Sequence, residues 1–248
     1  MTRRRILEGP RGSGHASSPR IRLLNGFELL CGHQPVPLPA CVERVIVFLA
    51  LHERPLLRGL VAGTLWPEST DQRAAACLRS SLWRLRRTSP FVVEATASHI
   101  TLASGARVDV RDLLALAHSI LGGRSDWRTG ELALLLEPVV LLPGWYDDWV
   151  VAERERLSQT RLHALETLAE LLILEGRFAE AVDAGLAAVR DEPLRESAHR
   201  VLIKAYLAEG NQWEAVHQYR QYQHVIRQEL GLDPSPKMEH LVRHLSAP

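Results

Sequence analysis

The chain has 248 residues, a length that suits one large domain or two smaller ones. Its composition, 46% hydrophobic and 24% charged, is that of an ordinary globular protein. No apolar run approaches the roughly 18–20 residues of a membrane-spanning helix. Arg3-Arg4-Arg5 precede no apolar segment of the kind found in secretion signals. The three cysteines are odd in number and lack metal-ligand spacing, so we expect reduced, partly buried thiols and a cytoplasmic protein. No membrane partner is expected either, because no segment is apolar enough to span a bilayer.

The net charge of +1 hides a difference between the two halves of the chain. Residues 1–110 hold 15 basic and 8 acidic side chains, whereas residues 111–248 hold 15 and 21. Only two basic residues are lysines, and arginine is the better bidentate partner for phosphate and guanine. The pattern indicates that the first half binds a polyanion and that the second does not.

The N-terminal segment, residues 1–20, is rich in Gly, Ser, Pro and Arg and lacks periodicity. We expect a disordered basic tail, which is either simply solvated or lies along DNA. Turn residues and apolar spacing predict the elements that follow. They are a hairpin over 21–31 with Asn25-Gly26 as its turn, a strand through Val36 and Leu38, and helices over 42–52 and 58–66, the second ended by Pro67.

A third helix is predicted over residues 71–87, and Ser69, Thr70 and Asp71 offer capping side chains at its start. An apolar stripe at helical spacing predicts its buried side: Ala75, Leu78, Leu82 and Leu85. On the opposite face, arginines could bond guanine edges or phosphates. We expect this face to bind DNA through Arg73, Arg79, Ser80, Trp83, Arg84 and Arg87.

A second hairpin over residues 91–102, with a polar turn at 96–98, follows the third helix directly. Three helices followed by a hairpin make a winged helix-turn-helix, whose third helix enters the major groove. Further expected backbone contacts come from the hairpin turn and the first helix: Thr96, Ser98, His99 and Arg44. Three alternatives stay open. Trp83 could pack on the hairpin or a second protomer, Arg44 could pair with Glu43 or Glu53, and His99 could be simply exposed.

The C-terminal half is predicted to be all-α, with helices over 111–121, around 130–136 and from about 147 to 175. Two windows then repeat at an offset of 34 residues, because Glu175-Gly176 with Glu180-Ala181-Val182 matches Glu209-Gly210 with Glu214-Ala215-Val216. That period is typical of stacked tetratricopeptide helix pairs. Such a stack offers surfaces to other proteins and has no chemistry of its own.

Several motifs resemble one known family over about residues 21–245. Thr64-Leu65-Trp66-Pro67-Glu68, followed by Leu78-Arg79-Ser80-Ser81-Leu82-Trp83-Arg84-Leu85-Arg86, resembles the winged helix of the Streptomyces antibiotic regulatory protein family. Three further segments resemble that family's bacterial transcriptional activation domain: Pro143-Gly144-Trp145-Tyr146-Asp147-Asp148-Trp149, Glu192-Pro193-Leu194-Arg195-Glu196, and Glu229-Leu230-Gly231-Leu232-Asp233-Pro234-Ser235-Pro236.

The resemblance implies a mainly α fold with small β-sheets. A winged helix-turn-helix over residues 21–110 is followed by a tetratricopeptide-like activation domain over residues 111–248. It also implies a transcriptional activator that binds double-stranded DNA at promoter direct repeats, as a homodimer, and contacts the RNA polymerase holoenzyme. Such a protein is expected to be associated with the nucleoid. The chain has no P-loop, so ATP-driven control is not expected. Its hairpin return, Ser98-His99-Ile100, lacks the family's usual Gly-Tyr pair.

Catalytic motifs such as G-x-S-x-G and H-E-x-x-H are absent from the sequence, so we expect neither an enzyme nor a cofactor. His240 and His244 are four apart, but two ligands make a poor metal site, and none is predicted. Two other functions remain open. One is a protein-binding scaffold whose winged helix mainly dimerises. The other is a ligand-gated regulator, although no cluster of convergent polar residues in the sequence marks a ligand site.

Overall fold

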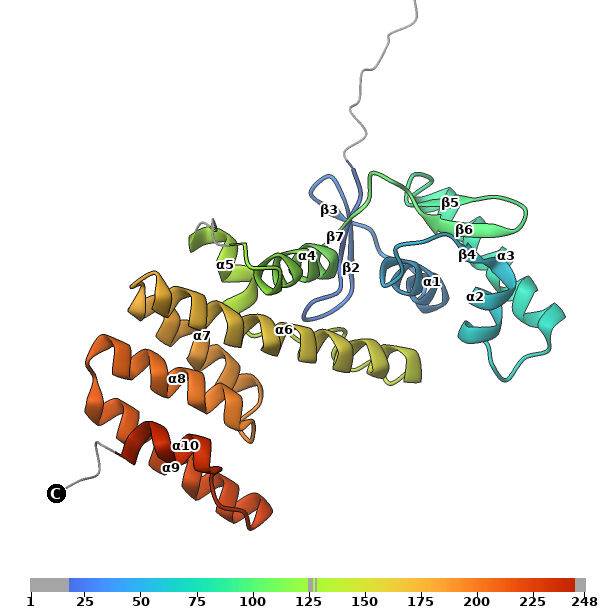
Figure 1. Ribbon diagram of the computed structural model, residues 1–248. Helices are drawn as coiled ribbons and strands as arrows, with labels where there is room; N and C mark the ends of the chain where they lie inside the picture. Colours follow the sequence, from blue (N-terminus) through green and yellow to red (C-terminus); the bar gives the residue numbers. More distant parts are fainter. Residues whose placement is uncertain (1–17, 125–126, 128, 244–248) are drawn as a thin grey trace, which may run out of the picture. The chain divides into compact units, whose positions relative to one another are not determined.

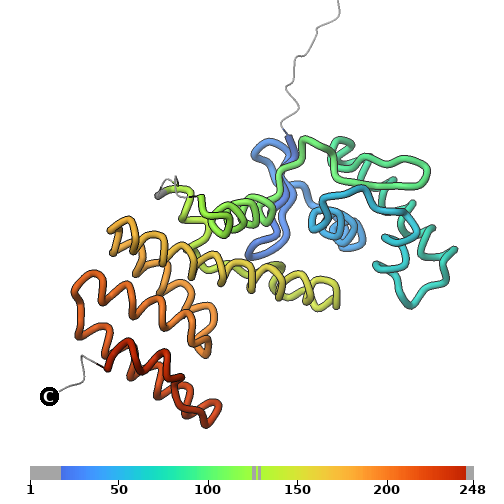
Figure 2. Tube along the Cα trace, in the orientation of Figure 1, coloured from blue at the N-terminus to red at the C-terminus, as the bar shows by residue number. Residues whose placement is uncertain are grey.

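The computed structural model describes residues 18–124, 127 and 129–243, which fall into two compact units. Unit 1 contains the described residues of Met1–Ile21 and Glu28–Arg107, and unit 2 those of Arg22–Phe27 and Val108–Pro248 (Figures 1 and 2). Most of the tail expected over residues 1–20 lies outside the described residues, and Arg20 already begins the first strand.

The described chain begins with a four-stranded sheet of very short strands, in the order β3-β2-β1-β7. The predicted turn at Asn25-Gly26 lies between β1 and β2, and Asn25 adopts a left-handed φ of 62°. The strand predicted through Val36 and Leu38 is wrong in position, because β3 ends before Val36. Val36 only donates its N–H to the Leu29 carbonyl, at 2.8 Å. The strands are β1 (Arg20–Arg22), β2 (Glu28–Cys31), β3 (Gln34–Pro35) and β7 (Arg107–Val108).

Three helices and a second sheet complete unit 1. The predicted helices are confirmed as α1 (Ala40–Ala50), α2 (Arg58–Leu65) and α3 (Asp71–Thr88). The predicted hairpin is present as β5 (Val93–Ala95) and β6 (His99–Leu102). A strand that the sequence analysis missed, β4 (Leu56–Leu57), pairs with β6, so the sheet order is β4-β6-β5. The core between these elements is aliphatic, with Val42, Ile46, Val61, Leu65, Leu78, Leu85 and Ile100 buried.

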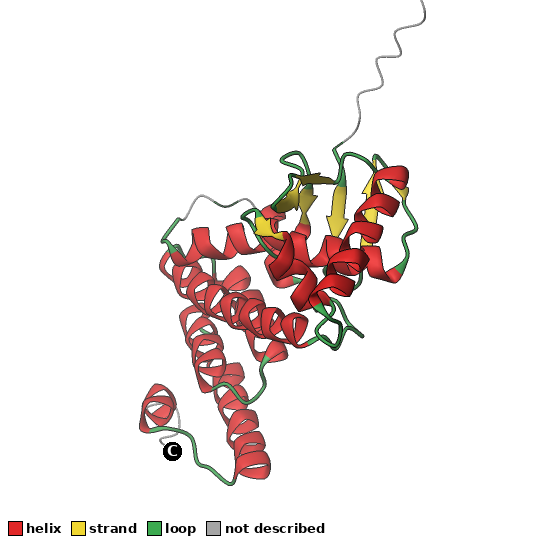
Figure 3. Cartoon of the chain, turned by 90° about the vertical axis from the view of Figure 1, so that its right-hand side faces the viewer, coloured by secondary structure: helices red, strands yellow, loops and turns green. Residues whose placement is uncertain are grey.

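Unit 2 is a succession of helices in which α6 packs on α7, α7 on α8, and α8 on α9. In Figure 3 this part of the chain is drawn as red helices joined by green loops. Of the described helices, none is long and apolar enough to cross a membrane. The elements are α4 (Asp109–Leu121), α5 (Thr129–Leu136), α6 (Asp148–Leu174), α7 (Phe178–Asp191), α8 (Glu196–Glu209), α9 (Gln212–Leu230) and α10 (Pro236–Val242).

The 34-residue repeat corresponds to two equivalent helix ends. Gly176 follows α6 with φ 73°, and Gly210 follows α8 with φ 91°. A left-handed residue at this place lets the chain reverse after a helix, and glycine adopts it without a Cβ clash. The repeated glycines therefore set the two turns that start α7 and α9.

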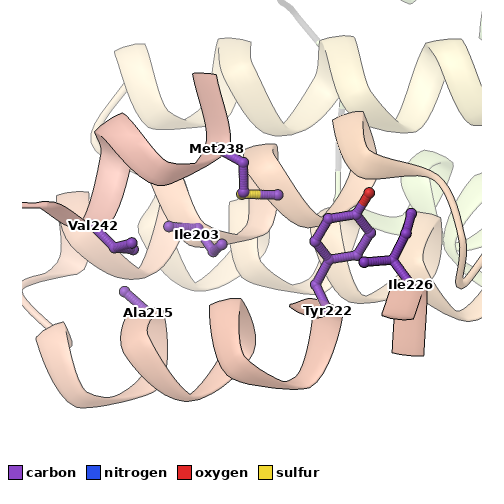
Figure 4. Close-up of a cluster of buried hydrophobic side chains, with 6 residues drawn as sticks. All are labelled: Ile203, Ala215, Tyr222, Ile226, Met238 and Val242. Carbon is purple, nitrogen blue, oxygen red and sulfur yellow. The ribbon is translucent and has the colours of Figure 1, made fainter. Parts of the chain in front are cut away.

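The last three helices share a small core, shown in Figure 4. Tyr222 and Ile226 of α9 face Met238 of α10, and Ile203 of α8 lies between the two helices. Two of the family-like motifs meet beside this core. The Glu196 carboxylate accepts hydrogen bonds from the Ser235 N–H at 2.8 Å and from the Ser235 hydroxyl. The two motifs thus hold the C-terminal helix α10 in place, so their residues have a structural role that stabilises the fold.

His199, on α8, is buried and hydrogen-bonded at both ring nitrogens. Nε2 lies 2.8 Å from the Pro193 carbonyl, which can only accept, so Nε2 carries the proton. Nδ1 lies 2.8 Å from the Gln218 amide nitrogen on α9 and accepts its N–H. Burial lowers the pKa of His199, although the Pro193 bond and Glu196 oppose the shift. The neutral ring therefore joins the α7–α8 loop to α9.

Acidification should destabilise unit 2 through His199. Because the folded-state pKa lies below the unfolded value, the unfolded chain takes up the proton first, and stability falls as the pH drops below about 6.5. Each unit of depression is worth about 1.4 kcal/mol. Urea unfolding of the wild type, His199→Gln and the exposed control His217→Gln between pH 5 and 7.5 measures this. The free energy of unfolding of His199→Gln should depend less on pH than that of the wild type. If His217→Gln reduces this pH dependence and His199→Gln does not, the assignment to His199 is wrong.

Candidate nucleic-acid interface

The third helix, α3, is amphipathic. Ala74, Leu78, Leu82 and Leu85 are buried, together with Ser81, whereas Ala75, expected on that stripe, is only half-buried. Asp71 in the first turn and two arginines in the last complement the helix dipole. The expected side-chain cap is not formed, because Thr70 occupies the N-cap position without a side-chain hydrogen bond. Packing of the apolar stripe on α1 and α2 therefore fixes this helix.

All five arginines of α3 are exposed, with Asp71 as the helix's only acidic residue. At about 100° per residue, the centre of the exposed face falls near Ala76, Ser80, Trp83 and Arg87, opposite the buried stripe. Arg73 and Arg84 lie along one edge of this face, and Arg79 and Arg86 along the other. The structure therefore brings together every α3 residue predicted to contact DNA: Arg73, Arg79, Ser80, Trp83, Arg84 and Arg87.

Trp83 and Arg87 form a pair on this face. The Trp83 side chain is 58% exposed, and the Arg87 guanidinium carbon lies 4.8 Å from its ring centroid. This cation–π contact holds the guanidinium outward beside a flat apolar surface. Its energy at an exposed site is only about 0.5–1 kcal/mol, so both side chains stay available to a ligand.

Arg84 lies at the edge next to α1. Its Nη1 donates to the Cys41 thiol at 3.7 Å, a weak contact that orients the guanidinium. Arg44, on α1, is half-buried, in contrast to the α3 arginines. Its predicted backbone contact stays a prediction.

The hairpin turn presents Thr96 and Ser98 to solvent, with His99 half-buried at the start of β6. The Thr96 N–H donates to the His99 carbonyl at 2.9 Å, and the His99 N–H donates to the Thr96 hydroxyl at 3.0 Å. The Ser98 hydroxyl lies 2.8 Å from Nδ1 of His99. The turn is thus internally hydrogen-bonded and holds three polar side chains at one end of the hairpin.

Arg58 is a site residue that sequence reasoning missed. Its N–H donates to the Ser98 carbonyl at 2.9 Å, and its Nη1 donates to the Thr96 carbonyl at 3.2 Å. It fastens the hairpin turn to the start of α2. Together with Arg79 and Ala97 it lines a recess between α2, α3 and the turn. The sequence offers no local signal for this role, because β4 (Leu56–Leu57), which brings Arg58 to the hairpin, has only two residues and pairs with β6.

This surface is equipped to bind a polyanion. Arg73, Arg79 and Arg86 have no hydrogen-bond or ion-pair partner within the described chain, so their charge is available for phosphates or base edges. The described residues include no group of three His, Cys, Asp or Glu side chains placed to hold a metal. His240 lies on α10, and His244 lies outside the described residues.

Comparison with known sequences defines the class. The profile of the family described as the bacterial transcriptional activator domain matches residues 103–245, more than half of the chain. The chain therefore belongs to this family, and its assignment to the Streptomyces antibiotic regulatory proteins is confirmed.

The relatives are longer proteins. Regulatory protein AfsR of Streptomyces griseus is 28% identical over 237 residues, which cover 91% of this chain and 24% of the relative. Regulatory protein AfsR of Streptomyces coelicolor is 30% identical over 211 residues, which cover 81% of this chain and 21% of the relative. The chain thus spans about a quarter or less of the length of these relatives.

The fold is also found among solved structures. One of these is Mycobacterium tuberculosis EmbR in complex with a low-affinity phosphopeptide, with a TM-score of 0.72 and 22% sequence identity. The similarity covers 92% of this chain and 65% of that chain.

Proposed function

We propose that this protein is a sequence-specific DNA-binding transcriptional regulator, an activator that binds direct repeats in promoters. Unit 1 acts as a winged helix-turn-helix, with α3 in the major groove and the β5–β6 turn at the backbone. The observation that carries the proposal is the exposed face of α3, with its five arginines and single acidic residue.

The geometry of unit 1 supports this assignment of roles. Arginine can bond guanine O6 and N7 in a bidentate way, and the Trp83 ring offers an apolar surface for a thymine methyl or a sugar. Thr96, Ser98 and His99 supply hydroxyl and imidazole groups suited to phosphate contacts. Arg58 holds their turn in place, and its charge adds to the same surface.

Unit 2, in this proposal, is a tetratricopeptide-like activation domain that contacts the RNA polymerase holoenzyme and pairs protomers on DNA. The support is family membership, the two equivalent glycine turns, and the acidic balance of residues 111–248. A stack of helix pairs exposes broad surfaces on which proteins can bind.

Selection of DNA by the full chain from a random-sequence pool tests the proposal. We expect recovery of a repeated motif, footprint protection of both copies, and at least 10³-fold weaker binding to unrelated DNA. Transcription in vitro with polymerase holoenzyme on a selected promoter should rise when the chain is added. Recovery of no motif, with binding equal on all sequences, would contradict sequence-specific recognition and favour a protein-binding scaffold.

A further inference from the structure

A pocket of about 340 Å³ in unit 2 brings together three arginines that are distant in the sequence. Arg154 and Arg161 come from α6, and Arg190 comes from the last turn of α7. The sequence analysis found no such convergence, because it depends on how α7 packs against α6. The pocket's volume lies within the range of small-molecule sites, about 300–1,000 Å³.

The pocket also has an apolar wall, which begins directly beside these charges, since Arg154 donates to the Leu141 carbonyl. Residues 138–141, after α5, contribute Pro138, Val139, Val140 and Leu141, and α6 adds Leu157 and Ser158. Asp191 is the only acidic residue in the lining. A set of three arginines and one aspartate leaves a local excess of positive charge, inside a half whose overall balance is acidic.

The arginines are held in place by backbone carbonyls. Arg154 donates from Nε to the Leu141 carbonyl at 2.8 Å and from Nη2 to the Leu142 and Trp145 carbonyls at 2.8 and 3.0 Å. Arg190 donates from Nη2 to the Leu136 carbonyl at 2.7 Å. Within the described chain, Nη1 of Arg154 and Nη1 of Arg190 have no hydrogen-bond partner. Each guanidinium is therefore oriented in advance and retains donors for a ligand.

Asp191 is shared between two arginines. It pairs with Nη1 of the buried Arg161, and Nε of Arg190 lies 3.5 Å from its other oxygen. Arg190 is close enough to Arg161 to help lower the pKa of Arg161, after the larger effect of burial. One carboxylate thus faces two mutually repelling cations, and a second anion would relieve this repulsion.

We propose that this pocket binds a small organic anion, with its carboxylate or phosphate on Arg154 and Arg190 and its apolar body on residues 138–141. Charge-assisted hydrogen bonds to guanidinium favour either head group. The apolar wall selects an anion with a hydrocarbon or aromatic part over an inorganic ion. Binding here would make the helical unit ligand-responsive, which goes beyond DNA recognition by unit 1.

Titration of the full chain, without DNA, with four probes tests the site: hexanoate, phenyl phosphate, inorganic phosphate and the neutral hexanamide. Saturation-transfer NMR and calorimetry should give a Kd of about 1 mM or lower for at least one organic anion. The stronger of hexanoate and phenyl phosphate identifies the head group. Inorganic phosphate and hexanamide should bind at least tenfold more weakly. The proposal is overturned if neither hexanoate nor phenyl phosphate binds, or if the neutral hexanamide binds as tightly as hexanoate.

Two pairs of variants locate the bound anion. Val140 is 48% exposed at the pocket, so Val140→Glu places a carboxylate there without removing an arginine, and Val140→Gln is its neutral match. Both variants lose apolar wall at this position, but only Val140→Glu adds a negative charge, so we expect at least tenfold weaker binding of the anion in Val140→Glu than in Val140→Gln. Arg190→Gln should weaken binding about tenfold, whereas Arg156→Gln, on α6 outside the pocket lining, should not. If the two variants of either pair have the same anion affinity, the anion does not bind in this pocket. This outcome is independent of whether unit 1 binds DNA.

Discussion

Replacement of Arg161 by methionine is expected to lower the free energy of unfolding by about 3–5 kcal/mol. Arg161 is 3% exposed, and it donates from Nε and Nη2 to the Leu135 carbonyl at 3.0 and 2.7 Å. Its Nη2 also donates to the Glu137 carbonyl at 2.7 Å, and its Nη1 pairs with Asp191. Methionine would fill similar volume but leave the carbonyls and the carboxylate without this donor.

Urea unfolding of the full chain, followed by far-UV circular dichroism, measures this loss. Arg156→Met is the matched control, because Arg156 lies on the same helix, is 56% exposed and forms a surface ion pair with Glu153 at 2.7 Å. A surface pair of this kind is worth about 1 kcal/mol or less. The double variant Arg161→Met with Asp191→Leu should recover part of the loss, since no orphaned carboxylate remains. Equal destabilisation by both single variants would contradict a buried anchoring role for Arg161.

The burial of Arg161 could be predicted from the sequence, but its hydrogen-bond and ion-pair partners could not. Arg161 interrupts an apolar stripe of α6, between Leu157 and Leu165, and a charge in that position signals a buried partner. The identity of the partner is set by tertiary packing. Leu135 lies 26 residues away along the chain, and Asp191 lies at the end of α7. Periodicity predicts which helix faces are buried but not which side chains of two helices meet.

The helices were predictable because their signals are long and local. α3 is 18 residues long, and apolar spacing at helical period identified both its buried side and its arginine face. β4 has only two residues and exists because β6 pairs with it, so no periodicity could reveal it. The same limit concealed Arg58, whose role depends on that pairing. Of the capping side chains offered by Ser69, Thr70 and Asp71, Thr70 occupies the N-cap position but makes no capping hydrogen bond.

The family-like motifs identified the protein family, but the sequence alone did not explain why they contain these particular residues. Glu196 and Ser235 are 39 residues apart in the sequence. Their hydrogen bonds join the two C-terminal motifs and position α10 together. Similarly, Arg154 holds the carbonyls of Leu142 and Trp145 around the Pro143-Gly144 motif. Much of what identifies this family in the helical unit is therefore structural. DNA-sequence specificity would come instead from unit 1, from the exposed face of α3.

Removal of two arginines from that face should weaken DNA binding by about 2–6 kcal/mol if each reads a base edge. Arg79 lines the recess beside the hairpin turn, and Arg87 lies over Trp83, so Arg79→Ala with Arg87→Ala removes charge from two separate places. If both contact phosphates instead, the slope of log affinity against log salt should become shallower by about 1.8. Fluorescence anisotropy on a selected site, from 50 to 300 mM salt, measures both quantities.

The matched control removes the same charge from unit 2. Arg156→Ala with Arg220→Ala takes two exposed arginines from α6 and α9 and should leave DNA affinity and salt slope unchanged. A general effect of net charge would lower affinity equally in both double variants, because long-range attraction depends on total charge. Only direct contact makes the α3 pair differ from the control. Identical binding curves for the two variants would place DNA, if it binds at all, on some surface other than α3.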